Sequence, residues 1–466
     1  MQHEKNDLLA DLNRRSFLKN SSFATIAALM GGVALKAADQ PEDKPKAEGQ
    51  TETKVAVSPP LKMAVIGCGA WGREILKTLA IMPNAPVLAI CDTYEPMMKR
   101  AKQSAPSAEL VADYKKVLEN KEIQGVVVAT PTHLHRDLVL EALKAGKHVY
   151  CEAPLAHTID DARTIAKAAR AAYKVNFQAG LQYRSDPQRY FLLQFVRSGA
   201  LGKSVMARAQ RNKKESWRRT ATTPEREKEL NWRLSKDISP GLVGEIGIHQ
   251  LDMASLFIYA KPVSVIGFGG LILHTEDGRD VADTVQTVVE YPNAVLSNFA
   301  CTLANSFDAE YEVYYGTDSA IMVRENKAWM FKEADAPLLG WEVYAKKETF
   351  YKETGISLSA DATKLKKDPK AVDDGIVPPN EAPLYKSLEA FITNSGILAA
   401  GVEDFVSNFG NDEKALRDYL PTVMKNKSHA AGYQEGFEAT VTALKANEAV
   451  VTGQKILFKP EWFELG

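Results

Sequence analysis

Residues 62–72 of the chain read Lys62-Met63-Ala64-Val65-Ile66-Gly67-Cys68-Gly69-Ala70-Trp71-Gly72. A short apolar run leads into G-x-G-x-x-G, and residues 70–81 have the apolar spacing of a helix. Strand, glycine turn and helix in this order predict a dinucleotide-binding βαβ unit. The first glycine permits the tight turn, the second lets the backbone approach a pyrophosphate, and the third allows the helix to pack closely on the strand. The backbone amides of Ala70 and Trp71 begin the helix and are expected to face the phosphates.

A second expected strand, residues 87–91, ends at Asp92, which lies 20 residues after Gly72. A carboxylate at this position can accept hydrogen bonds from ribose hydroxyls and would repel a 2′-phosphate. The next residues, 93–95, offer no arginine to pair with such a phosphate. The sequence therefore predicts NAD rather than NADP as the cofactor.

Strands and helices continue to alternate after Asp92. We expect strands at residues 125–130, 148–151 and 175–181, and helices at residues 133–145 and 159–172. Repeated β-α units imply an α/β Rossmann domain with a doubly wound parallel sheet, whose ligand groups gather where the strands end. Three motifs fall at such ends: Thr130-Pro131-Thr132-His133-Leu134-His135, Glu152-Ala153-Pro154 and Gln182-Tyr183-Arg184.

The following part of the chain predicts a second domain. Strand-like patterns occupy residues 205–210, 263–273, 284–291 and 295–303, with turn residues between several of them, and a helix begins near Leu242. A charged loop is expected at 213–237, and segments 334–380 and 396–431 are expected to be loops or inserted segments. We place the Rossmann domain at residues 61–183, an α+β domain at 184–450 and a short C-terminal segment at 451–466.

The N-terminus has the pattern of an export signal. Asn13-Arg14-Arg15-Ser16-Phe17-Leu18-Lys19 resembles the twin-arginine translocation motif, and an apolar stretch at 23–35 has the length of a signal h-region. We expect a signal peptide at 1–38, a disordered linker at 39–60, and a periplasmic or otherwise exported protein. A compartment of this kind offers little free nicotinamide cofactor, so an exported enzyme would have to hold its NAD tightly.

Charge and hydropathy exclude two kinds of partner. The formal net charge of the 466 residues is −1, so no global field recruits nucleic acid. No apolar run reaches the roughly 18–20 residues that a membrane span needs. A small molecule is the expected ligand.

The strand-end motifs, in their order, resemble the Gfo/Idh/MocA family of sugar oxidoreductases. The family's T-P-x-x-x-H, which lines the nicotinamide side, is matched by the segment from Thr130 and Pro131 to His133 and His135. Its E-K-P, whose lysine is the usual catalytic residue, is matched by Glu152-Ala153-Pro154. The resemblance implies NAD, a carbohydrate substrate, a C-terminal domain with a large open and mainly antiparallel sheet, and a homo-oligomer, a dimer or tetramer, formed through that sheet.

The family's D-x-G-x-H-x-x-D, which supplies the acid and histidine on the substrate side, is matched by residues 245–252. Glu245, His249 and Asp252 are spaced i, i+4 and i+7 and would share one helix face. Carboxylates one turn away on each side would fix the tautomer of the histidine and raise its basicity. We therefore interpret His249 as the catalytic acid or base, oriented by Glu245 or Asp252. Arg184, Asp252, Trp232 and Arg233 are the candidates for substrate contact, with surface packing as the alternative for the last two.

Ala153 departs from the family pattern, because alanine can neither transfer a proton nor polarise a hydroxyl. His249 with Glu245 could take the substrate's proton, Tyr183 could do so if its pKa were depressed, or catalysis could be lost and sugar binding kept. Some relatives of the family with a similar signal are redox-neutral NAD-dependent glycosidases that also lack this lysine, although their helix motif differs from residues 245–252. The sequence thus leaves three functions open: a net oxidoreductase, a redox-neutral glycosidase or lyase, and a non-catalytic sugar-binding protein.

No third ligand accompanies His133 and His135, so we expect no metal.

Overall fold

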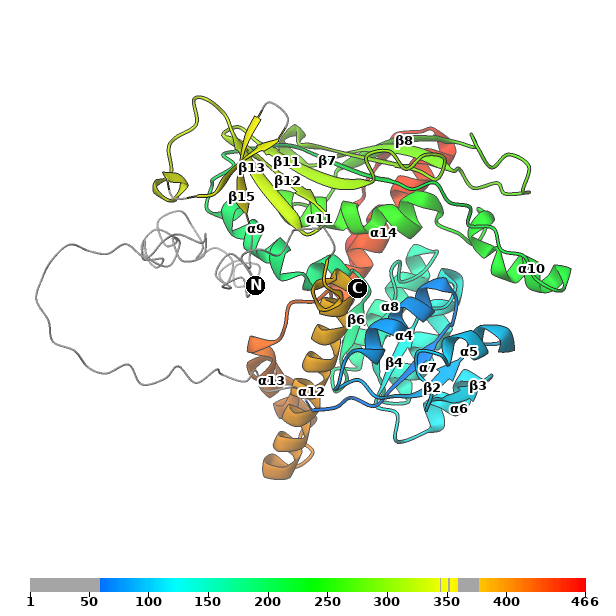
Figure 1. Ribbon diagram of the computed structural model, residues 1–466. Coiled ribbons are helices and arrows are strands. Elements are labelled where there is room, and N and C mark those ends of the chain that lie inside the picture. The colour runs from blue at the N-terminus through cyan, green and yellow to red at the C-terminus, as the bar shows by residue number, and fades with distance from the viewer. Residues whose placement is uncertain (1–58, 344, 351–352, 359–376) are drawn as a thin grey trace, which may run out of the picture.

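The computed structural model describes residues 59–343, 345–350, 353–358 and 377–466. The predicted signal peptide and nearly all of the predicted linker lie outside these residues. Two sheets organise the described chain, a six-stranded parallel sheet and a ten-stranded mixed sheet (Figure 1). No described helix is long and apolar enough to span a bilayer.

The first sheet has the strand order β3-β2-β1-β4-β5-β6, and every strand pair in it is parallel. Its strands are β1 (Met63–Ile66), β2 (Val87–Cys91), β3 (Glu109–Val111), β4 (Gly125–Val128), β5 (His148–Cys151) and β6 (Phe177–Ala179). The central strand places Val65 between Ile90 and Val127. This order confirms the predicted Rossmann domain, in which ligands bind beyond the carboxyl ends of the strands.

Helices cover both faces of this sheet. They are α4 (Ala70–Ala80), α5 (Glu95–Ala101), α6 (Tyr114–Glu119), α7 (His135–Lys144) and α8 (Ile159–Ala171). Ile75, Leu76 and Leu79 of α4 are buried, as their helical spacing predicts. The Thr158 hydroxyl caps α8 by accepting a hydrogen bond from the amide of Asp161.

A helix that the sequence did not predict completes the first domain. Residues 396–431, expected as loops, lie mainly in α12 (Pro383–Phe409) and α13 (Glu413–Val423). Apolar side chains of α12 pack on the sheet face that α4 also covers, in a cluster that includes Met63, Val65 and Phe391. The Tyr150 hydroxyl lies 3.1 Å from the Ser387 hydroxyl of α12. A segment that we had placed in the second domain therefore covers the sheet of the first.

The second sheet has the order β14-β15-β13-β12-β11-β7-β10-β9-β8-β16. Only β7 and β10 pair in parallel among these strands, which confirms a mainly antiparallel sheet. The strands are β7 (Ser204–Asn212), β8 (Ser264–Gly270), β9 (Thr284–Glu290), β10 (Leu296–Thr302), β11 (Glu310–Gly316), β12 (Ser319–Arg324), β13 (Lys327–Lys332), β14 (Lys347–Phe350), β15 (Glu353–Leu358) and β16 (Ile456–Leu457). The predicted loop at 334–380 thus contains two of its strands.

Helices α9 (Pro187–Arg197), α11 (Ile248–Ile258) and α14 (Tyr433–Thr452) lie under this sheet, and α14 lies between the two domains (Figure 1). α14 packs against β8 on one side and α8 on the other. The C-terminal residues are part of the same body, because β16 pairs with β8 and Arg170 donates to the Gly466 carbonyl at 2.7 Å. The charged segment expected as a loop contains α10 (Pro224–Leu230).

Candidate functional site

Of the three glycines in the turn after β1, only Gly69 has open space beside its Cα. A Cβ added to Gly67 (φ 99°) would lie 2.5 Å from the Ala129 carbonyl oxygen, and one added to Gly72 would lie 1.9 Å from the Gly67 oxygen. A Cβ on Gly69 would meet nothing within 4 Å. No side chain caps α4, which begins at Ala70, so its first amides are free to bind phosphate. The residues of this turn therefore fit NAD.

Asp92 is held beside this turn. Its Oδ2 accepts a hydrogen bond from the Cys68 amide at 2.8 Å, and its Oδ1 accepts one from the Tyr94 amide at 2.8 Å. Each carboxylate oxygen has a second lone pair that remains available to a ribose hydroxyl.

Asp92→Ala is expected to reduce the preference for NAD over NADP, because it removes both the ribose acceptor and the charge that repels a 2′-phosphate. The ratio of the two dissociation constants, measured by calorimetry, checks this. Glu95→Gln is a matched control, since Glu95 is an exposed acid three residues further along that pairs with Lys99. An unchanged ratio in Asp92→Ala would refute the role of this carboxylate.

The segment after β4 joins the two domains. The Thr132 hydroxyl donates to Glu245 Oε1 at 2.7 Å, while the Thr130 hydroxyl, next to Pro131, is buried without a partner. His133 is half-buried, and its ring makes edge contacts with His157 and Trp232 at 6.1 and 5.8 Å. Burial lowers the pKa of His133, and His157 lowers it further.

His135 does not face the cofactor cleft. Its ring is buried, with Nδ1 3.0 Å from the Pro154 carbonyl and Nε2 3.0 Å from the Thr130 carbonyl. It joins the loop after β4 to the loop after β5. This placement contradicts the predicted cofactor contact, because neither ring nitrogen is free to reach a dinucleotide.

Glu152, at the end of β5, is a buried carboxyl with an unpartnered oxygen. Burial raises its pKa to about 7, although the Trp71 indole, the Ala153 amide and the charge of Arg233 oppose the shift. Its Oε1 has no hydrogen-bond partner. A Cβ on Gly180 would lie 2.6 Å from Oε2, so this neighbour must be small. The carboxyl can therefore gain or lose a proton near neutral pH.

Glu245 lies in a π-helical turn, Val243–Gly247, just before α11. Its carboxylate accepts from Thr132 and from Arg233 Nε, the latter at 2.9 Å. Burial raises its pKa despite the charge of Arg233. Turns of this type are frequent at functional sites. Glu245 therefore connects the two domains. The prediction that it orients His249 is wrong, because its carboxylate is bound to Thr132 and Arg233 instead.

His249 has different neighbours from those the helix spacing predicted. Burial lowers its pKa to about 4; the charge of Glu310 opposes this shift and that of Arg211 adds to it. Its Nδ1 is buried without a partner. The predicted rise in basicity is wrong, because the two flanking acids are engaged elsewhere. The ring is neutral at pH 7 and can accept a proton.

Asp252 and Arg184 bind each other. Arg184 Nε and Nη2 donate to the two Asp252 oxygens at 2.8 and 2.7 Å. The Asp252 side chain is 4% exposed. This bidentate pair fixes the chain after β6 to α11, so neither member orients His249.

Tyr183, Gln250 and Glu310 form a cluster beside His249. The Tyr183 hydroxyl and the Gln250 amide both donate to Glu310 Oε1, at 2.6 and 2.8 Å, and Arg211 lies 3.6 Å from Oε2. The Tyr183 ring lies 5.9 Å from that of His249 in an edge contact. Burial and Glu310 raise the pKa of Tyr183 well above its usual value. The depressed pKa that proton transfer by Tyr183 requires is therefore contradicted.

Sequence reasoning did not identify Glu310 or Arg211. Glu310 begins β11 and Arg211 is the last residue but one of β7, and the two residues pair across these neighbouring strands. Neither belongs to a motif, and only the sheet register brings them close to His249. The sequence carried no local signal for either.

Two predicted substrate contacts lie near the Rossmann strand ends. The Arg233 guanidinium is 5.0 Å from the Trp232 ring and 5.6 Å from the Trp217 ring. The Trp232 side chain is buried, and the Arg233 side chain is 42% exposed. Arg233 can thus present a charge to a ligand while it remains paired with Glu245.

Comparisons with known proteins agree with this geometry. The family model described as "Oxidoreductase family, NAD-binding Rossmann fold" matches residues 61–180, and the model of the GFO/IDH/MocA C-terminal domain matches residues 192–321. Together the two models span more than half of the chain. The chain belongs to the Gfo/Idh/MocA oxidoreductase family. It is accordingly an enzyme with NAD as its cofactor.

Relatives and solved structures are consistent with the family assignment. The 2,7-anhydro-N-acetylneuraminate hydratase of Escherichia coli is 25% identical over 56% of this chain and 67% of its own length. The levoglucosan dehydrogenase of Pseudarthrobacter phenanthrenivorans is 25% identical over 56% of this chain and 73% of its own length. A structure of levoglucosan dehydrogenase with NADH covers 85% of this chain and 99% of its own, with a TM-score of 0.63 and 16% identity, which shows the shared fold.

Proposed function

We propose that this enzyme acts on a sugar or glycoside by NAD-dependent hydride transfer, with His249 as the proton acceptor. The observation that carries the proposal is the unpartnered Nδ1 of a neutral histidine beside the Tyr183–Glu310 pair. Two relatives, a levoglucosan dehydrogenase and a myo-inositol 2-dehydrogenase from Thermotoga maritima, support a carbohydrate-like substrate.

Residues of the first domain bind the cofactor, and His249 of the second domain transfers the proton. The glycine turn, Asp92 and Glu152 hold the dinucleotide, which when bound supplies a hydride acceptor. His249 removes the proton from the substrate hydroxyl as the C–H bond breaks. Glu310 stabilises the resulting imidazolium, because its charge favours the protonated ring. Tyr183, held protonated, positions Glu310.

Ala153 supports a second candidate, a redox-neutral glycosidase or lyase. No ammonium group stands at this position to assist simple dehydrogenation. A relative named a hydratase also adds water, a reaction with no net redox change. In such a cycle the hydroxyl is oxidised, the neighbouring C–H loses a proton, the leaving group departs, and water and the hydride are added back. Glu152 and His249 offer two proton-transfer groups for these steps.

One experiment separates the two candidates. The protein is incubated with NAD⁺ and a panel of free sugars and aryl glycosides, while NADH absorbance and released aglycone are recorded together. A net oxidoreductase gives NADH in proportion to oxidised sugar, and the redox-neutral enzyme releases aglycone without NADH. If neither signal appears with any substrate, while sugars raise the thermal unfolding temperature, the protein binds sugar without catalysis and the proposal fails.

We also propose that the folded protein is exported by the twin-arginine route and works as a homo-oligomer. Arg14 and Arg15 within their motif support the first part. Replacing both with lysine is expected to retain the protein in the cytosol, which cell fractionation measures. Export of the doubly substituted protein at the wild-type level would refute the signal.

Sedimentation of the purified enzyme tests the oligomer, and a monomer would refute it.

A further inference from the structure

Residues 213–237 form an arm that leaves the second sheet after β7 and returns to α11. α10 lies at its tip (Figure 1). The Asn231 side chain joins the two limbs of the arm, because its Oδ1 accepts from the Arg219 amide and its Nδ2 donates to the Arg219 carbonyl, both at 2.7 Å. The arm therefore has a defined structure, with a helix at its tip and hydrogen bonds between its two limbs.

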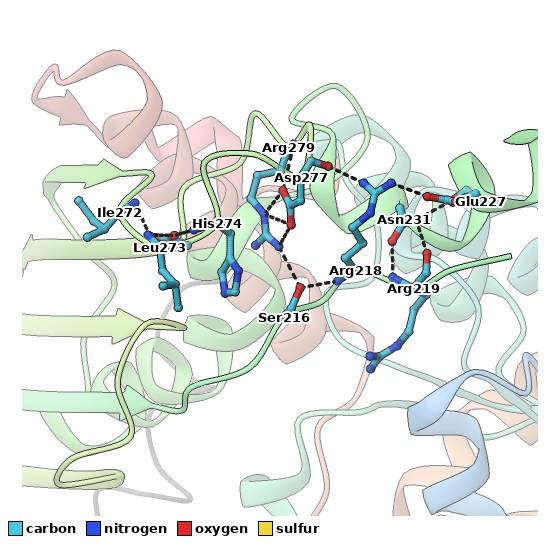
Figure 2. A network of polar contacts seen from close by, with 11 residues as sticks. Ser216, Arg218, Arg219, Glu227, Asn231, Ile272, Leu273, His274, Asp277 and Arg279 are labelled. Carbon is cyan, nitrogen blue, oxygen red and sulfur yellow. Dashed lines mark hydrogen bonds and ion pairs between the residues drawn. The ribbon is translucent and has the colours of Figure 1, made fainter.

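The β8–β9 connection holds the base of the arm. Figure 2 shows Arg218 reaching both the Asp277 carbonyl and the Glu227 carboxylate of α10. The Asp280 amide donates to the Leu234 carbonyl at 3.1 Å. Contacts on both limbs fix the direction in which the arm projects from the second domain.

The tip of the arm reaches the loop that follows β2. Arg226 of α10 donates to the Thr93 carbonyl at 2.9 Å and to the Thr93 hydroxyl at 3.2 Å. Its guanidinium also lies 4.7 Å from the centre of the Tyr94 ring. Thr93 follows Asp92 directly, so this contact is at the ribose end of the dinucleotide site.

The other end of the arm lies beside the segment that follows β4, where the rings of Trp232 and His133 make an edge contact. Arg233 pairs with Glu245, whose carboxylate also accepts from Thr132. In the sheet, β2 and β4 lie on the two sides of β1, which carries the glycine turn. The two contacts of the arm thus flank the place where the pyrophosphate binds.

We propose that Arg226 is a cofactor-retention residue, which holds the arm against the loop after β2 so that bound NAD leaves only when the contact with Thr93 opens. The inference rests on NAD binding by the Rossmann domain and not on the substrate. Arg226 is a positioning residue, because it acts through the arm. Retention of this kind suits an enzyme that works where free NAD is scarce.

The dissociation rate of the reduced cofactor tests the latch. Protein loaded with NADH is mixed with excess NAD⁺, and the loss of bound nicotinamide fluorescence is followed in time. Arg226→Ala is expected to release NADH about tenfold faster, since hydrogen bonds from a charged donor are lost. Arg226→Lys, which keeps the charge but loses the two-pronged contact, should give an intermediate rate.

Lys228→Ala provides the matched control, because Lys228 is an exposed cation on the same helix. Its release rate should equal that of the wild type.

If Arg226→Ala releases NADH at the wild-type rate, the latch does not exist. If that variant fails to fold, Arg226→Lys decides: faster release than the wild type supports the latch, and the wild-type rate overturns it. A failure to process any sugar would refute the proposed function and leave these rates unaffected.

Discussion

His249→Ala is expected to lower kcat by on the order of 10²- to 10⁴-fold while NAD still binds, because a general base typically contributes that much. The ring is neutral at pH 7, since burial lowers its pKa to about 4, and its Nδ1 has no partner in the described chain. The cofactor residues lie in the loops that follow the Rossmann strands and make no contact with this ring. Steady-state kcat with the best substrate, together with the NAD dissociation constant, measures both parts.

His429→Ala is a matched control for this prediction. His429 is an exposed histidine that stacks on Tyr190, with ring centres 3.7 Å apart, outside the His249 cluster. It should retain wild-type kcat. His249→Asn keeps a polar side chain but cannot carry the proton, so it should be as inactive as His249→Ala. Turnover retained in either His249 variant would mean that another group removes the proton.

His148→Asn is expected to protect the fold against acid. His148 in β5 is buried, and its Nδ1 accepts the Asn176 amide at 2.9 Å. Burial lowers its pKa to about 4 from the usual 6.5. Between these values the unfolded chain binds a proton that the folded chain does not, so stability is lost as pH falls from 6.5 towards 4. A shift of this size corresponds to about 3 kcal/mol.

Denaturant unfolding at several pH values measures this effect as a difference between two curves. Asparagine can accept the same amide hydrogen bond but does not titrate. The wild type should lose about 3 kcal/mol relative to His148→Asn between pH 7 and pH 4, and the two should run parallel above pH 7. Parallel curves over the whole range would show that His148 does not remain neutral in the folded protein.

The Rossmann domain was predictable because its signals are local. The limits of β2 and β5 coincide with the predicted strands, and α4 and α8 end within one residue of prediction. Glycine spacing and apolar runs are read from neighbouring residues alone, and the parallel order follows from the alternation.

α12 was missed for a physical reason. Gly396 and Gly401 lie inside it, and glycine lowers helix propensity by about 1 kcal/mol relative to alanine. A Cβ on Gly401 would lie 2.7 Å from Val423 of α13, so close helix packing requires the glycine there. Tertiary contact thus outweighs local propensity, and a single sequence does not show that contact.

The hydrogen-bond partners of the candidate site residues differ from those that the sequence predicted. Glu245, His249 and Tyr183 do lie at the domain interface, but Glu245 pairs with Arg233 and Asp252 pairs with Arg184. Helix spacing places these residues along one segment but cannot give their partners, which come from other elements. Glu310 reaches His249 only through the register of the second sheet.

The cofactor content of the purified protein tests the central claim, an NAD enzyme that retains its cofactor, most directly. The protein is produced in the cytosol without added cofactor and denatured, and the released NAD⁺ and NADH are quantified by chromatography. The glycine turn, Asp92 and the arm predict about one dinucleotide per chain. No dinucleotide, together with no binding of added NAD⁺, would contradict the account and leave a Rossmann domain that has lost its ligand.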